Sequence, residues 1–276
     1  MKNSIVWLAS FPKSGNTWTR IFLANYFANR DAPLSINEAD RFGFGDSVLS
    51  MYQRVAGPGL DVNNKPQVVS VRNHVLQAIV ANNADLNFVK THNAFTNAYG
   101  VDLFPRQVSR CGIYIVRNPQ DVVLSYARHF GISHEDVVMR MSRSDHLTLP
   151  YENQVTQFLG SWSDHVSGWA STGVFPVLTV RYEDMLDRPV DSFRAILQHI
   201  GAPVDEARLE KAVRFSSFDE VSKQEREQGF KEASHYADRF FAKGEAGQWR
   251  EGLAPELSRK IRKQHRKVMK KHGYLE

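Results

Sequence analysis

The sequence predicts an α/β fold in which helices flank a central parallel β-sheet. Short apolar runs bounded by polar or turn residues indicate buried strands, and longer stretches between them have helical spacing. Strands that alternate with helices are typical of parallel sheets with right-handed crossovers. The chain has 276 residues, of which 42% are hydrophobic, enough for one large core. We therefore expect a single domain over residues 1–276.

The expected elements follow this alternation along the chain. The expected strands cover 5–9, 86–90, 112–116 and 177–181. The expected helices cover roughly 16–29, 67–83, 119–130, 154–170 and 189–200. Residues 222–255 are polar and contain glycines, so we expect a long functional loop there, followed by a basic C-terminal helix over 256–272.

The net charge of +5 is concentrated near the C-terminus. Eight Lys and Arg residues lie between Leu257 and Leu275 with no Asp or Glu, so 35 − 8 = 27 basic residues face 30 acidic ones elsewhere. This distribution favours a helix that packs on the body with a charged outer face. Contact with an anionic surface or cofactor is the alternative. No nucleic-acid-binding motif is present, so we expect no nucleic-acid partner.

Several classes of protein are disfavoured by composition. The single cysteine, Cys111, excludes an internal disulfide and favours a reducing compartment. No apolar run reaches the roughly 18 residues of a membrane span, and the start lacks the features of a signal peptide. No cluster has metal-ligand spacing, so we expect no metal. A cytoplasmic protein is expected, and the oligomeric state is left open.

The predicted strand ends carry polar side chains that suit an anion. In open α/β sheets, ligands bind beyond the carboxyl ends of the strands. The first strand leads through the loop 10–18 into a helix, and such a turn aims backbone N–H groups and a helix dipole at one point. The following strand ends carry, in chain order, Lys90 and His92, then Arg117 and Ser125, then Tyr182. We expect them to meet at one rim that binds a phosphate-bearing ligand.

The loop 10–18 differs from a Walker A loop, Gly-x-x-x-x-Gly-Lys-Ser/Thr. Here Lys13 precedes Gly15, which is the only glycine of the loop. The magnesium-holding arrangement is therefore not reproduced. A phosphate monoester or a sulfate-phosphate anhydride fits better than a nucleoside triphosphate, and an ordinary strand-to-helix turn is the alternative.

Taken together, these motifs resemble those of sulfotransferases that use 3′-phosphoadenosine-5′-phosphosulfate (PAPS), of the cytosolic type and its bacterial relatives. Residues 10–18 resemble the 5′-phosphosulfate loop and residues 115–126 the 3′-phosphate motif. Lys90-Thr91-His92 resembles the stretch with the catalytic histidine, and residues 242–250 resemble the late glycine loop. Residues 181–185 match a further signature. The resemblance implies a single P-loop-like domain.

The resemblance also implies which residues bind PAPS. Those implied for the 5′-phosphosulfate are Lys13, Ser14, Gly15, Asn16 and Thr17. Those implied for the adenine are Trp18 and Phe218, with Tyr182 and Ser216 nearby. Those implied for the 3′-phosphate are Arg117, Ser125, Lys243 and Gly244. Two residues depart from the family pattern: Asn16 replaces a common Thr, and Ala242 replaces an Arg, which removes one 3′-phosphate cation.

The implied reaction is sulfuryl transfer from PAPS to a hydroxyl or amine of a small-molecule acceptor. Histidine has an ordinary pKa near about 6.5, so His92 suits the role of general base. Lys13 would stabilise the leaving oxygen and Lys90 the sulfuryl group, and Ser125 would restrain Lys13 until acceptor binds. Each of these residues also has a non-catalytic interpretation. His92 could be structural, Lys90 could be an ordinary surface residue, and Arg117 could cap the following helix.

Two other functions stay open, namely an atypical P-loop kinase and a non-catalytic nucleotide-binding protein. The acceptor is not identified. Segments 31–66 and 131–153 are expected to shape its pocket. The aromatic residues that either line this pocket or belong to the core are Phe11, Phe42, Phe44, Phe95, Tyr99, Phe130 and Tyr151.

Overall fold

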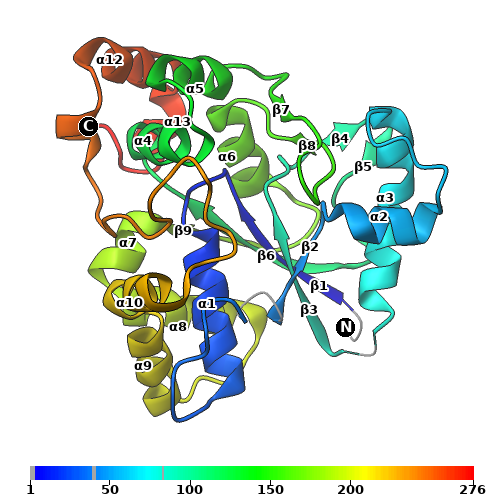
Figure 1. The fold of residues 1–276 in the computed structure, drawn as a ribbon, viewed down its shortest axis with the longest axis horizontal. Coiled ribbons are helices and arrows are strands. Elements are labelled where there is room, and N and C mark those ends of the chain that lie inside the picture. Colours follow the sequence, from blue (N-terminus) through cyan, green and yellow to red (C-terminus); the bar gives the residue numbers. More distant parts are fainter. Residues whose placement is uncertain (1–3, 39–41, 83) are drawn as a thin grey trace. The chain divides into compact units, whose positions relative to one another are not determined.

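The computed structural model describes residues 4–38, 42–82 and 84–276 (Figure 1). Its strands are β1 Ser4–Ser10, β2 Phe44–Gly45, β3 Leu86–Thr91, β4 Asn97–Ala98, β5 Val101–Asp102, β6 Ser109–Val116, β7 Leu147–Thr148, β8 Gln157–Phe158 and β9 Val177–Arg181. Its first helices are α1 Asn16–Ala28, α2 Leu49–Ala56, α3 Lys65–Val80, α4 Pro119–Phe130, α5 His134–Met141 and α6 Trp162–Ser171. The later helices are α7 Tyr182–Asp187, α8 Pro189–Ile200, α9 Glu206–Phe215, α10 Phe218–Gln228, α11 Trp249–Gly252, α12 Pro255–Gln264 and α13 Arg266–Lys271.

The chain forms two compact units, and each is built from three separate segments. Unit one consists of Met1–Phe11, Gly43–Tyr114 and Met141–Thr179. Unit two consists of Pro12–Phe42, Ile115–Arg140 and Val180–Glu276. Unit one contains α2, α3 and α6, and unit two contains α1, α4 and α7 to α13. The chain passes from one unit to the other within β6, α5 and β9.

A five-stranded sheet has the strand order β2-β3-β1-β6-β9. Strands β1 and β3 pair in parallel from Ser4↔Leu86 to Ala9↔Thr91, and β2 pairs in parallel with β3. Every residue of β1 is buried, as expected for a strand covered on both faces. The prediction of an α/β fold with a central parallel sheet is confirmed. The four predicted strands correspond to β1, β3, β6 and β9, whereas the two-residue β2 was not predicted.

The predictions at 16–29, 119–130 and 189–200 are confirmed by α1, α4 and α8. Both α4 and α8 begin with a proline and end before a glycine with left-handed backbone, Gly131 or Gly201. Proline suits the first helical position and glycine the position after the last, so the sequence marks both ends. The helix predicted at 67–83 is α3, capped by Asn64 and ending at Val80. Residue 83 lies outside the described residues.

Two predictions of local structure are wrong, and a third is confirmed except for one interruption. The helix expected at 154–170 begins only at Trp162, because the Ser161 side chain caps it and residues 157–158 pair as β8 with β7. The loop expected at 222–255 is helical up to Gln228 and again in α11. The helix expected at 256–272 is two helices, α12 and α13, since His265 has non-helical backbone angles (φ −104°, ψ 14°).

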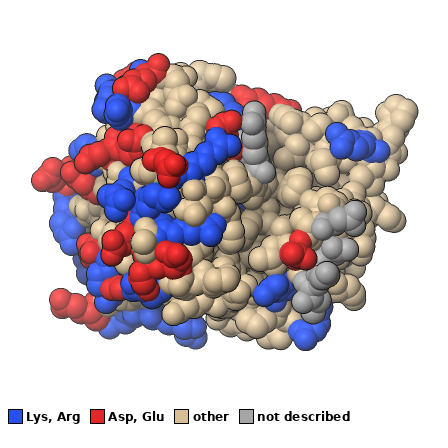
Figure 2. All heavy atoms as spheres, turned by 90° about the horizontal axis from the view of Figure 1, so that it is seen from below, with Lys and Arg blue, Asp and Glu red and all other residues tan. Residues whose placement is uncertain are grey.

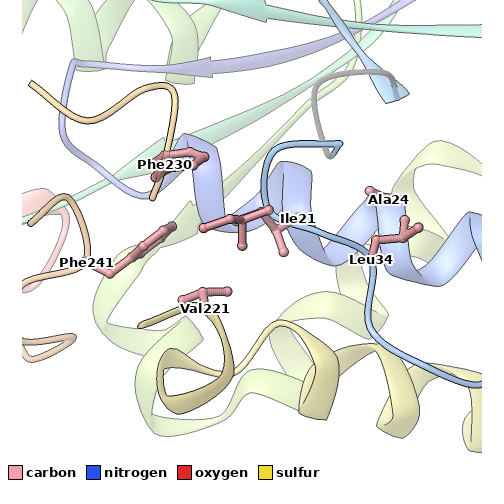
Figure 3. Packing of buried hydrophobic residues seen from close by; sticks show 7 residues of the cluster. Ile21, Ala24, Leu34, Val221, Phe230 and Phe241 are labelled. Atoms are coloured by element: carbon pink, nitrogen blue, oxygen red, sulfur yellow. The ribbon is translucent and has the colours of Figure 1, made fainter. Parts of the chain in front are cut away.

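The hydrophobic core of unit two joins α1 to segments that follow much later in the sequence (Figure 3). Ile21 and Ala24 of α1 pack with Val221 of α10 and with Phe230 and Phe241 of the segment after it. Burial of a large apolar side chain contributes about 1.5–3 kcal/mol. This core therefore fixes the segment 229–248 against the helix that follows the loop 10–18.

On the face drawn in Figure 2, Lys and Arg side chains are interspersed with those of Asp and Glu. Within the described ranges, no helix is long and apolar enough to cross a membrane.

Candidate active site

The loop after β1 has the backbone of an anion-binding turn. Lys13 has a positive φ of 67°, which is uncommon for a non-glycine residue, and Gly15 has φ 106° at the N-cap of α1. A Cβ at Gly15 would lie 2.7 Å from the Tyr182 ring. Only glycine therefore satisfies both the backbone and the space at this point. The turn leaves the N-terminus of α1 without a side-chain cap.

Lys13 and Arg117 lie on the same side of unit two. An Nη1 proton of Arg117 is donated to the carbonyl of Lys13 (3.1 Å), and Nη2 is 3.5 Å from the carbonyl of Glu245. The Arg117 guanidinium stacks on the Tyr182 ring at 4.3 Å. The Lys13 ammonium lies 3.9 Å from the centre of the Phe240 ring. Sequence reasoning did not predict a role for Phe240.

Two buried donors at this loop have no hydrogen-bond partner among the described residues: Ser14 Oγ and Arg117 Nε. The residues are 1% and 8% exposed, respectively. Leaving a buried donor unsatisfied costs about 1–3 kcal/mol. Phosphate oxygens are acceptors that would satisfy both, so the residues present fit a phosphorylated ligand.

The residues expected at the adenine also cluster in unit two. Trp18 donates from Nε1 to the carbonyl of Ser216 (2.8 Å) and meets the Tyr182 ring edge-on at 5.9 Å. Burial raises the pKa of Tyr182, which the positive charge of Arg117 partly opposes. Phe218 lies against Gly244, where a Cβ would come within 2.3 Å of its ring. The structure thus joins Trp18 to Tyr182 and Ser216, and Phe218 to the late glycine loop.

Other expected binding residues are less connected. Asn16 is buried, whereas Lys243 is exposed and Ser125 half-buried. In the part of the chain that the structure describes, the side chains of Ser125 and Lys243 make no hydrogen bond or ion pair. Thr17 donates a hydrogen bond to Glu232 (3.0 Å).

The Thr17 contact belongs to a salt bridge that sequence reasoning missed. The same Glu232 carboxylate accepts two hydrogen bonds from Nη2 of Arg20 (2.7 and 2.8 Å), and this nitrogen also contacts the Thr17 hydroxyl. Arg20 is buried, and its partner lies 212 residues away. No local signal links two positions so distant in sequence.

His92 lies in unit one, directly after β3. Its Nδ1 is 2.8 Å from the carbonyl oxygen of Ser10, the last residue of β1. Because a carbonyl only accepts, this contact assigns the proton of the neutral ring to Nδ1, which puts the lone pair on Nε2. Lys90 precedes it within β3 and is half-buried.

A buried carboxylate, Asp46, holds both neighbours of His92. Its Oδ2 accepts hydrogen bonds from Thr91 Oγ1 (2.6 Å) and Asn93 Nδ2 (3.0 Å). Its charge is paired with Arg72 at 2.7 Å, where the side chains are 2% and 3% exposed. Burial lowers the pKa of Arg72, but the charges and hydrogen bonds of Asp46 and Tyr52 together outweigh burial, so the pKa is raised. Asp46 follows the unpredicted β2, so no sequence pattern marked it.

His165 fixes the backbone of His92. Its Nε2 donates to the His92 carbonyl (3.0 Å), and the Tyr114 hydroxyl donates to its Nδ1 (2.9 Å). Burial lowers the pKa of His165 to about 4. The ring is therefore neutral near pH 7. It joins the Tyr114 hydroxyl to the His92 carbonyl by hydrogen bonds and contributes no charge to the site.

Unit one contains a pocket of about 320 Å³. Its wall includes Ala94, which follows His92 by two residues in the sequence. Residues 94–99, 144–146 and 158 contribute to its wall. Of the aromatic residues expected near an acceptor, Phe95 and Tyr99 line it. Phe11 is instead core, at 1% exposed. In the described ranges, no cluster of His, Cys, Asp or Glu side chains could hold a metal ion.

The family described as the sulfotransferase domain matches residues 3–273 of this chain. The chain belongs to that family. It is therefore an enzyme of the sulfotransferase family.

Relatives of this sulfotransferase are found among curated proteins and solved structures. Dog (Canis lupus familiaris) sulfotransferase 1B1 is 26% identical over 258 residues, covering 88% of this chain and 76% of the relative. Flavonol 4′-sulfotransferase of Flaveria chlorifolia is 24% identical, covering 94% and 77%. A mouse sulfotransferase crystallised with PAP has a TM-score of 0.60 at 19% identity, covering 98% of this chain and 86% of that one. Retinol dehydratase with androsterone and PAP has a TM-score of 0.65 at 18% identity, covering 98% and 82%. These structures share the fold of this sulfotransferase.

Proposed function

We propose that this sulfotransferase moves a sulfuryl group from PAPS to a hydroxyl or amine of a small-molecule acceptor. The observation that carries the proposal is the contact between His92 Nδ1 and the Ser10 carbonyl. It leaves the Nε2 lone pair as the basic site, and Ser10 is three residues before Lys13 in the chain. The related structures that were solved with PAP support PAPS as the donor.

The donor, when bound, supplies the sulfuryl group and leaves as 3′-phosphoadenosine-5′-phosphate. Ser14, Gly15, Asn16 and Thr17 bind its 5′ end, and Lys13 offsets negative charge on the leaving oxygen. Arg117, with Ser125, Lys243 and Gly244, binds the 3′-phosphate. Trp18, Tyr182, Ser216 and Phe218 hold the adenine. The unsatisfied Ser14 Oγ and Arg117 Nε support these assignments.

The chemical step needs one proton acceptor. Nε2 of His92 takes the proton from the acceptor hydroxyl or amine as the new O–S or N–S bond forms and the S–O bond to the leaving phosphate breaks. Lys90 offsets charge on the sulfuryl oxygens. Asp46 holds the side chains on either side of His92 and His165 holds the His92 carbonyl, so the ring is placed before substrate arrives. The nearby 320 Å³ pocket has room for a small acceptor.

Nucleotide binding separates this function from the alternatives. Affinities for 3′,5′-adenosine bisphosphate, ADP and ATP–magnesium are measured in parallel, followed by transfer of labelled sulfate to an acceptor library. We expect the bisphosphate to bind most tightly and label to reach an acceptor. Preference for ATP–magnesium would instead indicate a kinase, and tight bisphosphate binding without transfer would indicate a binding protein.

His92→Gln tests the proposed base. We expect transfer to fall by about 10²–10⁴-fold while bisphosphate affinity is retained, because a general base contributes to the chemical step alone. His74→Gln, at an exposed position of α3, is the matched control. A large loss of bisphosphate affinity in His92→Gln would contradict the assigned role.

A further inference from the structure

Helix α4 presents Asp121, Ser125 and Arg128 along one face. They are four and three residues apart, a spacing that places side chains on the same side of a helix. Asp121 accepts hydrogen bonds from the backbone N–H groups of Gly247 (2.7 Å) and Trp249 (2.9 Å). This face of α4 therefore meets the late glycine loop.

The other end of α4 meets the same segment of the chain. The helix stops at Gly131, and the Tyr236 ring lies so close that a Cβ there would be 2.6 Å from it. The chain between Tyr236 and Gly247 thus lies against the end of α4 at Tyr236 and is hydrogen-bonded to its first turn at Gly247. Arg128 is located between these two anchor points, on the face that carries Ser125.

Arg128 is a cation without a described anionic partner. Its side chain makes no hydrogen bond or ion pair with the residues in the described ranges. Arg128 is exposed to solvent, and desolvation together with the positive charge of Arg117 lowers the pKa of its guanidinium. Arg117 directly precedes the N-cap residue of α4, and Arg128 lies on the face of that helix that carries Ser125. A bound anion would stabilise this accumulation of positive charge.

Several unused donors accompany these two arginines. Arg117 Nε is buried and unsatisfied, and the Ser125 hydroxyl makes no hydrogen bond among the described residues. On the segment held opposite, Lys243 contributes an exposed ammonium, whereas Ala242 contributes no charge. A phosphate monoester with close to two negative charges suits such a group of donors.

We propose that Arg128 binds the 3′-phosphate of the nucleotide together with Arg117, and supplies the positive charge that Ala242 does not. This inference rests on the proposed function. It adds a binding residue on α4, the helix whose Asp121 contacts the late glycine loop. Charge at this position distinguishes nucleotides with a 3′-phosphate from those without one.

Arg128→Gln tests the inference by calorimetric titration with 3′,5′-adenosine bisphosphate and with ADP, which lacks the 3′-phosphate. We expect bisphosphate affinity to fall roughly tenfold or more, as for loss of a charge-assisted contact, and ADP affinity to be unchanged. Arg128→Lys keeps the charge and should retain most of the affinity. Lys260→Gln, an exposed position on α12, controls for net charge.

The double variant Arg128→Gln with Ala242→Arg places the charge on the facing segment instead. We expect it to regain bisphosphate affinity relative to Arg128→Gln alone. Unchanged bisphosphate affinity in Arg128→Gln, or an equal loss for ADP, would overturn the inference and leave the proposed function standing. A wild-type protein that binds ADP as tightly as the bisphosphate would overturn the proposed function itself.

Discussion

The ammonium group of Lys13 lies over the face of the Phe240 ring, 3.9 Å from its centre. A cation at this position is attracted by about 0.5–2 kcal/mol, depending on its exposure. Phe240 belongs to a segment whose backbone is held separately, since the Phe240 and Phe241 N–H groups donate to Glu225 (2.6 and 2.9 Å). Because the backbone of Phe240 is fixed in this way, its ring restrains the position of the Lys13 ammonium group.

Phe240→Leu should release Lys13 in the nucleotide-free protein. We expect faster acylation of the Lys13 amine, measured by peptide mass spectrometry and normalised to Lys260. Phe240→Tyr keeps an aromatic face and should label like the wild type. If Phe240→Leu leaves the Lys13 labelling rate unchanged, the ring does not restrain the amine.

Asp46→Asn should be strongly destabilising, because it leaves the Arg72 guanidinium buried without its counter-charge. Removing one partner of a buried pair costs about 3–5 kcal/mol of unfolding free energy. Urea unfolding measures this loss. Transfer assays on the folded fraction should show a lower kcat, because the single amide oxygen of Asn must serve the donors that two carboxylate oxygens serve now, among them Thr91 and Asn93. Asp191→Asn breaks the exposed pair with Arg194 and should scarcely change stability.

Stability should fall on acidification through His165. Its pKa is about 4 in the folded protein and near about 6.5 when unfolded, so between these values the unfolded chain binds more protons. The contribution of neutral, buried His165 to the free energy of unfolding is therefore fully present above the unfolded pKa. It is lost as the pH falls, and the loss is complete below about pH 4. The linkage amounts to about 3 kcal/mol. Urea unfolding of His165→Gln between pH 7 and 4 should show a smaller loss than the wild type; equal losses would contradict the assignment.

Gly15→Ala should weaken both the fold and nucleotide binding. A left-handed backbone costs a non-glycine residue about 1–2 kcal/mol, and the new methyl group would press on the Tyr182 ring. Displacement of that ring also disturbs Arg117, which stacks on it. Thermal unfolding and bisphosphate titration measure the two effects. Gly59→Ala has open space around its Cβ and should behave like the wild type.

The sequence predicted those parts of the fold that short-range rules control. Pro119 and Gly131 marked both ends of α4 because each residue has a backbone preference of its own. The start of α10 was missed although Ser217 and Glu220 have the spacing of a capping box, and the Ser217 side chain accepts from the Glu220 N–H. Its polar composition had favoured a loop. That signal was available in the sequence.

The parts of the candidate site that depend on distant pairing were not predictable. Glu232 meets Arg20 across 212 residues, and Asp46 meets Asn93 across 47. Such carboxylates resemble any surface Asp or Glu until the fold brings a partner to them. Phe240 and Arg128 are similar cases, because their significance depends on which residues face them. The residues of the loop 10–18, in contrast, are consecutive in sequence and belong to one turn, so the sequence alone marks them as a group.

The division of each unit into three segments has a consequence for biosynthesis. Unit one cannot acquire its last segment before residue 179 leaves the ribosome, and unit two is incomplete until residue 276 does. Domains of multi-domain proteins generally fold as units, the N-terminal one first during synthesis. Here unit one is complete only after 179 residues, by which point two of the three segments of unit two have also been made. No single cut separates the two units into independent fragments. Truncated forms should therefore expose apolar surface and need chaperones, instead of surviving as half-enzymes.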